Sequence, residues 1–464
     1  MPDRLSPLDV SLLAIETPST PMHVGSVAVL EQPEGGLDYE GLVGLIGRRI
    51  ALVPRYRQKI RAVPGRLAHP VWVDDDDFDL TYHVRRSALP KPGSDAQLRE
   101  LVGRLMSRRL DRHRPLWEIY LVEGLAGDRV GLITKTHHAM VDGVSAIDIG
   151  TVLLDRTAEP REVPDDDWVP DRPPGRLGLL AGAVVEYVAA PTQVLDVARV
   201  AVTDARTTAG RAVGAAGGVL SSLRIASRPA PDSPLNVALG EQRRFGTVST
   251  DLEDYKRVRQ AHGGTVNDVV LATVTGALRA WLLTRGEPVT PASAVRAMVP
   301  VSVRADGVRS QLGNRVSSYF VDLPVGEGNP VMRLHQVSFA MRGHTEAGES
   351  VGADALVQLS GFAPPTLHSL GARVASGLSR RLFNLVVTNV PGPQFPLYAS
   401  GARLLEMYPV VPLSKGQGLS VGLTSYDGGV YYGLNVDRDG LPDVDVLAGC
   451  IEESLAELVG TVRR

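Results

Sequence analysis

The chain has 464 residues and a net charge of −3, with 44% hydrophobic and 22% charged residues. This length is comfortable for two domains that each bury a core, and the near-neutral charge gives no indication of nucleic-acid binding. A single cysteine, Cys450, excludes an intrachain disulfide and is typical of a reducing compartment.

The sequence indicates neither a secretion signal nor a membrane span. The first seven residues include an acid and two prolines, whereas a signal peptide needs a basic and then an apolar segment. No apolar run reaches the roughly 18 residues of a spanning helix, and the nearest, Leu177 to Val185, ends at Glu186. We therefore expect a cytoplasmic protein that touches the inner membrane or lipid inclusions only peripherally.

The first 165 residues mix strand and helix patterns and form the first predicted subdomain. Val24–Leu30 predicts a strand, and Tyr39–Ile60 predicts a helix that ends in a basic stretch. Val130–Thr136 predicts a buried strand, and helical spacing resumes at Val144. The residues between this strand and this helix therefore lie on a strand-to-helix turn.

Residues 166–235 are predicted to be a helical linker. Residues 159–176 are rich in Pro, Asp and Arg, and 177–228 are rich in Ala, Gly and Val with apolar residues at helical spacing. From Arg206 to Arg228 there are four arginines and no acid, so this segment could contact anionic lipid headgroups. The alternative is a pair of helices that packs on protein.

Residues 236–464 form the second predicted subdomain, which is again α/β. Thr265 fits an N-cap with Asp268 in the first helical turn. Alternation over 295–303 predicts a strand, in which Pro300 suggests a bulge or an edge. Leu385–Val387 predicts a strand followed by a turn, and 419–437 predicts a hairpin.

The run His137-His138-Ala139-Met140-Val141-Asp142-Gly143 lies at the strand-to-helix turn. A base that deprotonates a hydroxyl near pH 7 must be mostly neutral, and imidazole suits this best, so His138 is the candidate base. Asp142 would orient the turn or support the imidazole, and Gly143 permits the bend. The alternatives are a polar pair that caps a helix, or a metal site, for which no third ligand stands at standard spacing.

Two other motifs are weaker candidates for a nucleophile. Gly418-Leu419-Ser420-Val421-Gly422 matches the hydrolase elbow G-x-S-x-G, but the pattern continues as a strand and no histidine follows it. Cys450 lies in a terminal helix pattern and is expected to be a buried thiol. Asn267 could donate a hydrogen bond to a reacting carbonyl, or merely belong to a helix start.

Eight short segments spread through both halves of the chain form an ordered set. They are Leu5–Asp9, Met22–Gly25, Asp111–Glu118, His137–Gly143, Asn267–Asp268, Val299–Arg304, Gly313–Asn314 and Thr388–Pro393. One match would be weak, but together and in this order they resemble the bacterial wax ester synthase/acyl-CoA:diacylglycerol acyltransferase family. Thr388-Asn389 departs slightly from the Ser-Asn expected at that place.

The resemblance implies a chloramphenicol acetyltransferase-like architecture, in which two α/β subdomains with mixed sheets enclose an active-site tunnel around the histidine. It implies that the segment with Trp117 shapes the acyl pocket, although a core tryptophan packed on the sheet fits the residues alone. Thr388 and Asn389 would face the tunnel, or merely satisfy a turn.

The implied activity is transfer of a fatty acyl group from acyl-CoA to diacylglycerol, and also to long-chain alcohols. His138, Asp142 and Asn267 are the expected catalytic residues, and Trp117, Gly143, Thr388 and Asn389 the expected substrate-binding residues. We expect no metal, no cofactor beyond acyl-CoA as co-substrate, no nucleic-acid partner, and a monomer or homodimer. The alternatives are the same fold with another acceptor, as in condensation chemistry, or a non-catalytic lipid-binding relative.

Overall fold

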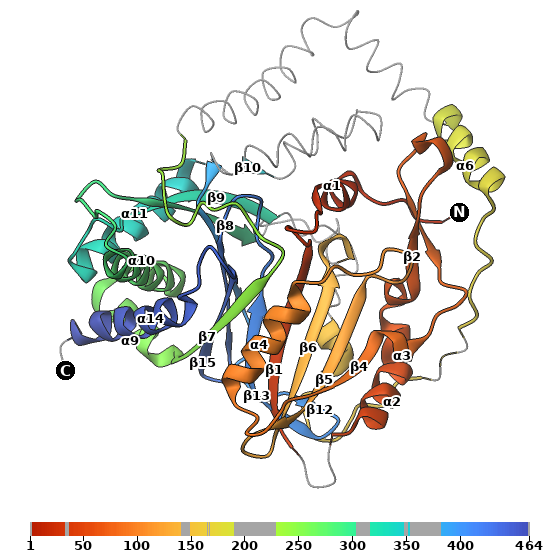
Figure 1. The fold of residues 1–464 in the computed structure, drawn as a ribbon, viewed down its shortest axis with the longest axis horizontal. Helices are drawn as coiled ribbons and strands as arrows, with labels where there is room; N and C mark the ends of the chain where they lie inside the picture. The colour runs from red at the N-terminus through yellow and green to blue at the C-terminus, as the bar shows by residue number, and fades with distance from the viewer. Residues whose placement is uncertain are drawn as a thin grey trace, which may run out of the picture.

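The computed structural model describes residues 2–32, 37–140, 149–164, 166, 168–189, 229–302, 316–347, 351–352 and 382–462. Two large mixed sheets dominate it and lie side by side (Figure 1), each with its own hydrophobic core. This agrees with the predicted pair of α/β halves.

The first sheet has the strand order β12-β13-β1-β6-β5-β4. At its centre, β1 pairs antiparallel with β6 along its full length, with His23 opposite His137. The predicted strands near residues 24–30 and 130–136 are thereby confirmed. The strands are β1 (His23–Glu31), β4 (Val84–Ala88), β5 (Trp117–Leu125), β6 (Arg129–His137), β12 (Tyr398–Ala399) and β13 (Ala402–Val410).

The helices of the first half begin at good capping residues. Ser6 caps α1 and Ser94 caps α4, each in a reciprocal capping box with the third residue of its helix. Asp38 caps α2 through the backbone N–H of Gly41. The helices are α1 (Pro7–Ile15), α2 (Tyr39–Arg49), α3 (Leu80–His83), α4 (Asp95–Met106) and α5 (Ile149–Leu153).

The helix predicted over Tyr39–Ile60 is too long, because α2 ends at Arg49. Pro54 cannot continue an α-helix, and it disfavours helical dihedrals at Val53, where φ is −133° and ψ is 68°. Two short 3₁₀ turns follow, and the basic stretch enters strand β2 (Gln58–Arg61), which pairs with β3 (Val71–Asp74).

The second sheet has the order β10-β9-β8-β11-β14-β15-β7. Helices α9, α10, α11 and α14 gather on its outer side (Figure 1). The strands are β7 (Arg243–Asp251), β8 (Val295–Ser302), β9 (Val316–Leu323), β10 (Val351–Gly352), β11 (Leu385–Pro391), β14 (Leu419–Tyr426) and β15 (Gly429–Asp437). The helices are α9 (Leu252–His262), α10 (Val266–Thr284), α11 (Pro330–Ala347) and α14 (Val444–Gly460).

Local signals in the second half match the structure closely. Thr265 and Asp268 form the capping box of α10, as predicted. Asp427 and Gly428 both have positive φ in the two-residue turn between β14 and β15. Strand β8, which carries Pro300, lies between β9 and β11 in the sheet order. The pairing of β8 with β11 covers only Ala297 and Met298, so β8 has one neighbour at Pro300.

A strand exchange joins the two halves, and the sequence did not predict it. Strand β13 comes from the second half but pairs with β1 in the first sheet, from Gly25–Val410 to Leu30–Leu404. A Cβ at Gly433 would lie 1.9 Å from the Pro409 carbonyl oxygen, so only glycine permits β13 to cross here. The boundary near residue 236 thus separates the halves of the chain but not the two sheets.

The predicted linker region is described only in part. Helix α6 (Arg176–Ala189) places Leu179 against Val71 and Val73 of the β2–β3 ribbon. The four arginines from Arg206 to Arg228 lie outside the described residues. Among the described helices, α10 alone is long and apolar enough to cross a membrane, and 72% of that stretch is buried in the protein.

Candidate active site

His138 stands at the end of strand β6, where the chain enters a 3₁₀ turn over His138–Met140. Its backbone N–H donates to the Met22 carbonyl oxygen at 2.8 Å, and Met22 immediately precedes β1. The ring is half-buried. The central strand pair of the first sheet therefore fixes the backbone of His138 and leaves its side chain partly accessible.

His137 is locked into the structure instead. Only 1% of the residue is exposed, its Nδ1 accepts the backbone N–H of Ala139 at 3.1 Å, and its Nε2 lies 3.8 Å from Oε1 of Glu16. An accepting Nδ1 requires the remaining ring proton on Nε2. Burial, then the positive charges of Arg112 and His138, lowers the pKa of His137 to about 3. His137 is therefore a neutral structural residue.

Glu16 connects the histidine turn to two other segments. Its Oε2 accepts from Nε of Arg112 at 3.0 Å and from Nη2 at 2.5 Å, and its Oε1 accepts from the Met22 N–H at 3.4 Å. The end of α1, the segment 111–118 and the start of β1 thus meet beside His137. Sequence reasoning missed Glu16 and its pairing with Arg112, which is 96 positions away, and no local pattern signals such a pair.

Asp142 and Gly143 lie outside the described residues, so their predicted roles stay predictions. The segment that follows them is well anchored. Arg49 donates to the Val152 carbonyl at 3.0 Å and to the Asp155 carboxylate at 2.7 Å, in a buried ion pair between α2 and the end of α5. The helix after the motif is therefore held on the first subdomain.

Asn267 and Asn389 come together, although 122 positions separate them. Asn267 is the second residue of α10, Asn389 lies in β11, and Nδ2 of Asn389 donates to Oδ1 of Asn267 at 3.2 Å. This leaves the amide NH₂ of Asn267 at a helix N-terminus, where the helix dipole favours negative charge. Thr388 is half-buried beside Asn389 and lies within the strand, not in a turn.

Trp117 packs in the core of the first subdomain with 1% exposure. Its Nε1–H donates to the Tyr56 carbonyl at 2.7 Å, and its ring stacks on His83 with centroids 4.6 Å apart. Nδ1 of His83 in turn lies 2.8 Å from the Trp117 carbonyl oxygen. These are the contacts of a core tryptophan, and its role in an acyl pocket stays a prediction.

Ser420 and Cys450 do not have the surroundings of nucleophiles. Ser420 is in the interior of β14 and donates its hydroxyl to the Val411 carbonyl at 2.7 Å, so the G-x-S-x-G match is not a strand-to-helix elbow. Cys450 is buried in α14, and burial raises the pKa of its thiol. In the described parts of the chain, no three His, Cys, Asp or Glu side chains cluster as metal ligands.

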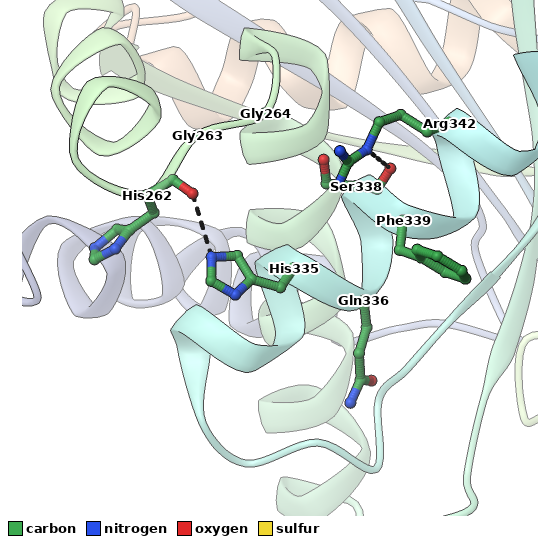
Figure 2. Close-up of a pocket in the computed structure, with 8 residues that line it drawn as sticks. All are labelled: His262, Gly263, Gly264, His335, Gln336, Ser338, Phe339 and Arg342. Carbon is green, nitrogen blue, oxygen red and sulfur yellow. Dashed lines mark hydrogen bonds between the residues drawn. The ribbon is translucent and has the colours of Figure 1, made fainter.

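One cavity, of about 560 Å³, lies beside the N-terminus of α10 (Figure 2). Gly263 and Gly264 form one wall, and His335, Ser338, Phe339 and Arg342 of α11 form the other. The Ser338 hydroxyl donates at 3.1 Å to Oδ2 of Asp268, which forms the capping box of α10 with Thr265. Helix α11 thereby supports the turn that carries Asn267.

A second cavity, of about 550 Å³, lies where the two halves meet. It is lined by Pro18, Arg104, Ser107, Arg108, Arg109, Glu241 and Gln242. The walls come from the loop after α1, the end of α4 and the segment before β7. His138 lines neither of these two cavities.

Comparison with known proteins covers nearly the whole chain. Residues 5–270 match the wax ester synthase/diacylglycerol acyltransferase catalytic domain, and residues 312–459 match the C-terminal domain of the same family. The wax ester synthase/diacylglycerol acyltransferase of Marinobacter aquaeolei superposes with a TM-score of 0.71 at 30% identity, covering 99% of this chain and 100% of that one. A condensation domain of the calcium-dependent antibiotic synthetase has a TM-score of 0.58 at 17% identity, which shows the fold alone.

Relatives in Mycobacterium tuberculosis carry a matching description. A probable diacylglycerol O-acyltransferase, tgs1, is 33% identical over 466 residues, covering 100% of this chain and 97% of its own. Another, tgs3, is 48% identical over 260 residues, covering 56% of this chain and 96% of its own. The predicted fold class and family are confirmed: this chain is an acyltransferase that belongs to the wax ester synthase/diacylglycerol acyltransferase family.

Proposed function

We propose that this enzyme transfers a fatty acyl group from acyl-CoA to the free hydroxyl of diacylglycerol, with long-chain alcohols as further acceptors. The observation that carries the proposal is the difference in burial and contacts between two adjacent histidines. His137 is sealed in the core as a neutral structural ring, whereas His138 is held by its backbone at a strand end with its ring half-buried. His138 is the histidine of the motif that can meet a substrate.

His138 acts as the general base in a single displacement. It removes the acceptor's hydroxyl proton while the oxygen attacks the thioester carbon, and the new C–O bond leaves a tetrahedral oxyanion. Collapse of this intermediate breaks the C–S bond and expels the CoA thiolate. The imidazolium then gives the thiolate the proton that it took from the acceptor hydroxyl. No covalent acyl-enzyme forms, so both substrates must be bound together, and their positioning supplies much of the rate.

Asn267 is the proposed oxyanion donor, and Asn389 is a positioning residue. The hydrogen bond from Asn389 occupies the carbonyl oxygen of the Asn267 amide, so the NH₂ group of Asn267 is available to donate. A preorganised hydrogen-bond donor that points at the developing negative charge usually contributes a large part of the transition-state stabilisation in acyl transfer. Asp142 and Gly143 complete the proposed machinery by orienting and bending the turn after His138.

Replacing the base tests the proposal most directly. His138→Ala should lower kcat for CoA release with diacylglycerol by roughly 10²–10⁴-fold, the usual contribution of a general base. His113→Ala is the matched control, because its side chain is 95% exposed. A His138→Ala enzyme that is correctly folded and keeps near-normal turnover would contradict the proposal.

A panel of acceptors separates the alternatives. CoA release measured with diacylglycerol, long-chain alcohols and amines should be fastest with diacylglycerol. Preference for amines would indicate condensation-like transfer, and lipid binding without CoA release would indicate a non-catalytic relative. We further propose that the enzyme works in the cytoplasm and meets its lipid acceptor peripherally, at a membrane or lipid-inclusion surface.

A further inference from the structure

The cavity between the two halves carries a net positive charge. Arg104, Arg108 and Arg109 line it, and all three side chains are exposed. Within the described parts of the chain, none of the three is in an ion pair. One acid, Glu241, lines the same cavity. Arginines without carboxylate partners suit a phosphate-bearing ligand, because guanidinium groups bind phosphate oxygens in bidentate pairs.

Buried contacts link this cavity to the histidine turn. Nζ of Lys135 donates to the carbonyl oxygens of Leu105, at 3.1 Å, and of Arg108, so the end of α4 is attached to β6. Lys135 is three residues before His138, or about 10 Å at the usual rise of a strand. An extended pantetheine arm is longer than this distance.

The loop after α1 provides a second link. Pro18 lines the cavity, and four residues later the Met22 carbonyl accepts the backbone N–H of His138. The guanidinium of Arg243, at the start of β7, donates to the Ser19 carbonyl, and its backbone N–H donates to the Ser107 hydroxyl at 2.9 Å. The cavity is thus built from both halves at the junction, with one wall continuous with the support of His138.

We propose that this cavity binds the 3′-phosphoadenosine diphosphate end of the acyl-CoA donor through Arg104, Arg108 and Arg109, with the pantetheine arm directed toward His138. The proposal rests on the proposed function for the identity of the donor. Its chemistry is specific, since the nucleotide end carries a diphosphate and a 3′-phosphate, and three separate guanidinium groups can pair with them. A diacylglycerol or an alcohol offers no such anion.

Binding is the first test, because it does not require turnover. In calorimetric titrations of the full-length protein, 3′,5′-ADP should bind to the wild type, and Arg104→Gln and Arg108→Gln should each weaken its affinity by roughly tenfold. Arg48→Gln is the matched control, because Arg48 is an exposed arginine in the last turn of α2, as Arg104 is in α4. Unchanged affinity in both pocket variants would overturn the proposal.

Donor discrimination is the second test. Each pocket variant should lower kcat/KM for acyl-CoA by roughly tenfold, through KM, and leave kcat/KM for the corresponding acyl-pantetheine at the wild-type value. Equal losses with both donors would mean that the arginines support the fold rather than the nucleotide, and would overturn the assignment. If neither donor is turned over, the proposed function fails. The titration with 3′,5′-ADP still shows whether the arginine cavity binds the nucleotide.

Discussion

The burial of His137 should make the protein sensitive to acid. The native pKa of His137 is lowered to about 3 from an ordinary value of 6.5, chiefly because burial disfavours the charged ring. In the unfolded chain the same ring takes up a proton as the pH falls through about 6.5. Between these values the unfolded state binds more protons than the native state, so the native state must lose stability as the pH decreases.

The size of this loss follows from the pKa difference. Each pH unit below 6.5 costs about 1.4 kcal/mol until the native pKa is reached, so pH 5 removes about 2 kcal/mol through His137 alone. His23 lies opposite His137 in the β1–β6 pair, and burial, followed by Lys135 and His137, also lowers its pKa well below the usual value. Its contribution has the same sign, so the total loss is larger.

Urea unfolding at pH 5, 6 and 7 measures this effect, with His137→Asn beside the wild type. The Asn carbonyl oxygen can still accept the Ala139 N–H but does not titrate, so the variant should lose about 2 kcal/mol less than the wild type between pH 7 and pH 5. His113→Asn is the control, because it removes a histidine whose side chain is 95% exposed, and it should leave the loss through His137 in place. A His137→Asn protein with the full wild-type dependence would refute the reasoning.

Asn389→Ala should lower kcat by roughly tenfold while Asn267→Ala lowers it by roughly 10²–10³-fold, and the double variant should be no worse than Asn267→Ala, as steady-state kinetics would reveal. Gly433→Ala should lower Tm by several degrees, because its Cβ would overlap a carbonyl of the crossing strand. Gly449→Ala in α14 should raise Tm slightly, because a Cβ there would meet no atom within 4 Å and alanine favours a helix. Trp117→Phe should cost about 1–3 kcal/mol in urea unfolding, because it removes the buried 2.7 Å hydrogen bond from Nε1 to the Tyr56 carbonyl.

Features with a local cause could be predicted from the sequence. The capping box of Thr265 and Asp268 and the turn at Asp427–Gly428 depend on neighbouring residues, and both occur as expected. The placement of His138 at a strand end depended on the apolar run before it, and it also holds. The helix predicted over Tyr39–Ile60 is too long, because Pro54 prevents a helix there although the apolar spacing continues past it.

Features made by distant residues had no signal in the sequence. Glu16 meets Arg112 across 96 positions, and Asn389 meets Asn267 across 122. The exchange of β13 into the first sheet also had no visible signal. Glycine is required at position 433 because the Pro409 carbonyl of β13 passes there, and this reason becomes clear only in the folded structure. The chemistry of the amide made Asn267 a candidate and the family resemblance made Asn389 one, but the hydrogen bond between them needed the fold.

One face of the first sheet explains how the motif and the arginine cavity are coupled. His137 and Lys135 are two residues apart in β6, so they share a face, and His23 lies opposite His137 in β1. Nε2 of His23 lies 3.0 Å from the Met106 carbonyl oxygen, and Lys135 donates to the Leu105 and Arg108 carbonyls. The backbone carbonyls at the C-terminal end of α4 thus accept hydrogen bonds from buried side chains beside the motif.

Gly25 lies in the same part of the sheet, because a Cβ there would lie 2.4 Å from the Thr134 carbonyl oxygen of β6 and 2.5 Å from the terminal methyl carbon of Met106. A side chain at this position would therefore overlap the backbone of β6 and meet the end of α4. Arg104 in α4, and Arg108 and Arg109 just after it, are therefore carried by a rigid support shared with His138. A ligand held by the arginines would have its reactive end at a fixed distance from the base, which is the positioning that a single-displacement mechanism requires.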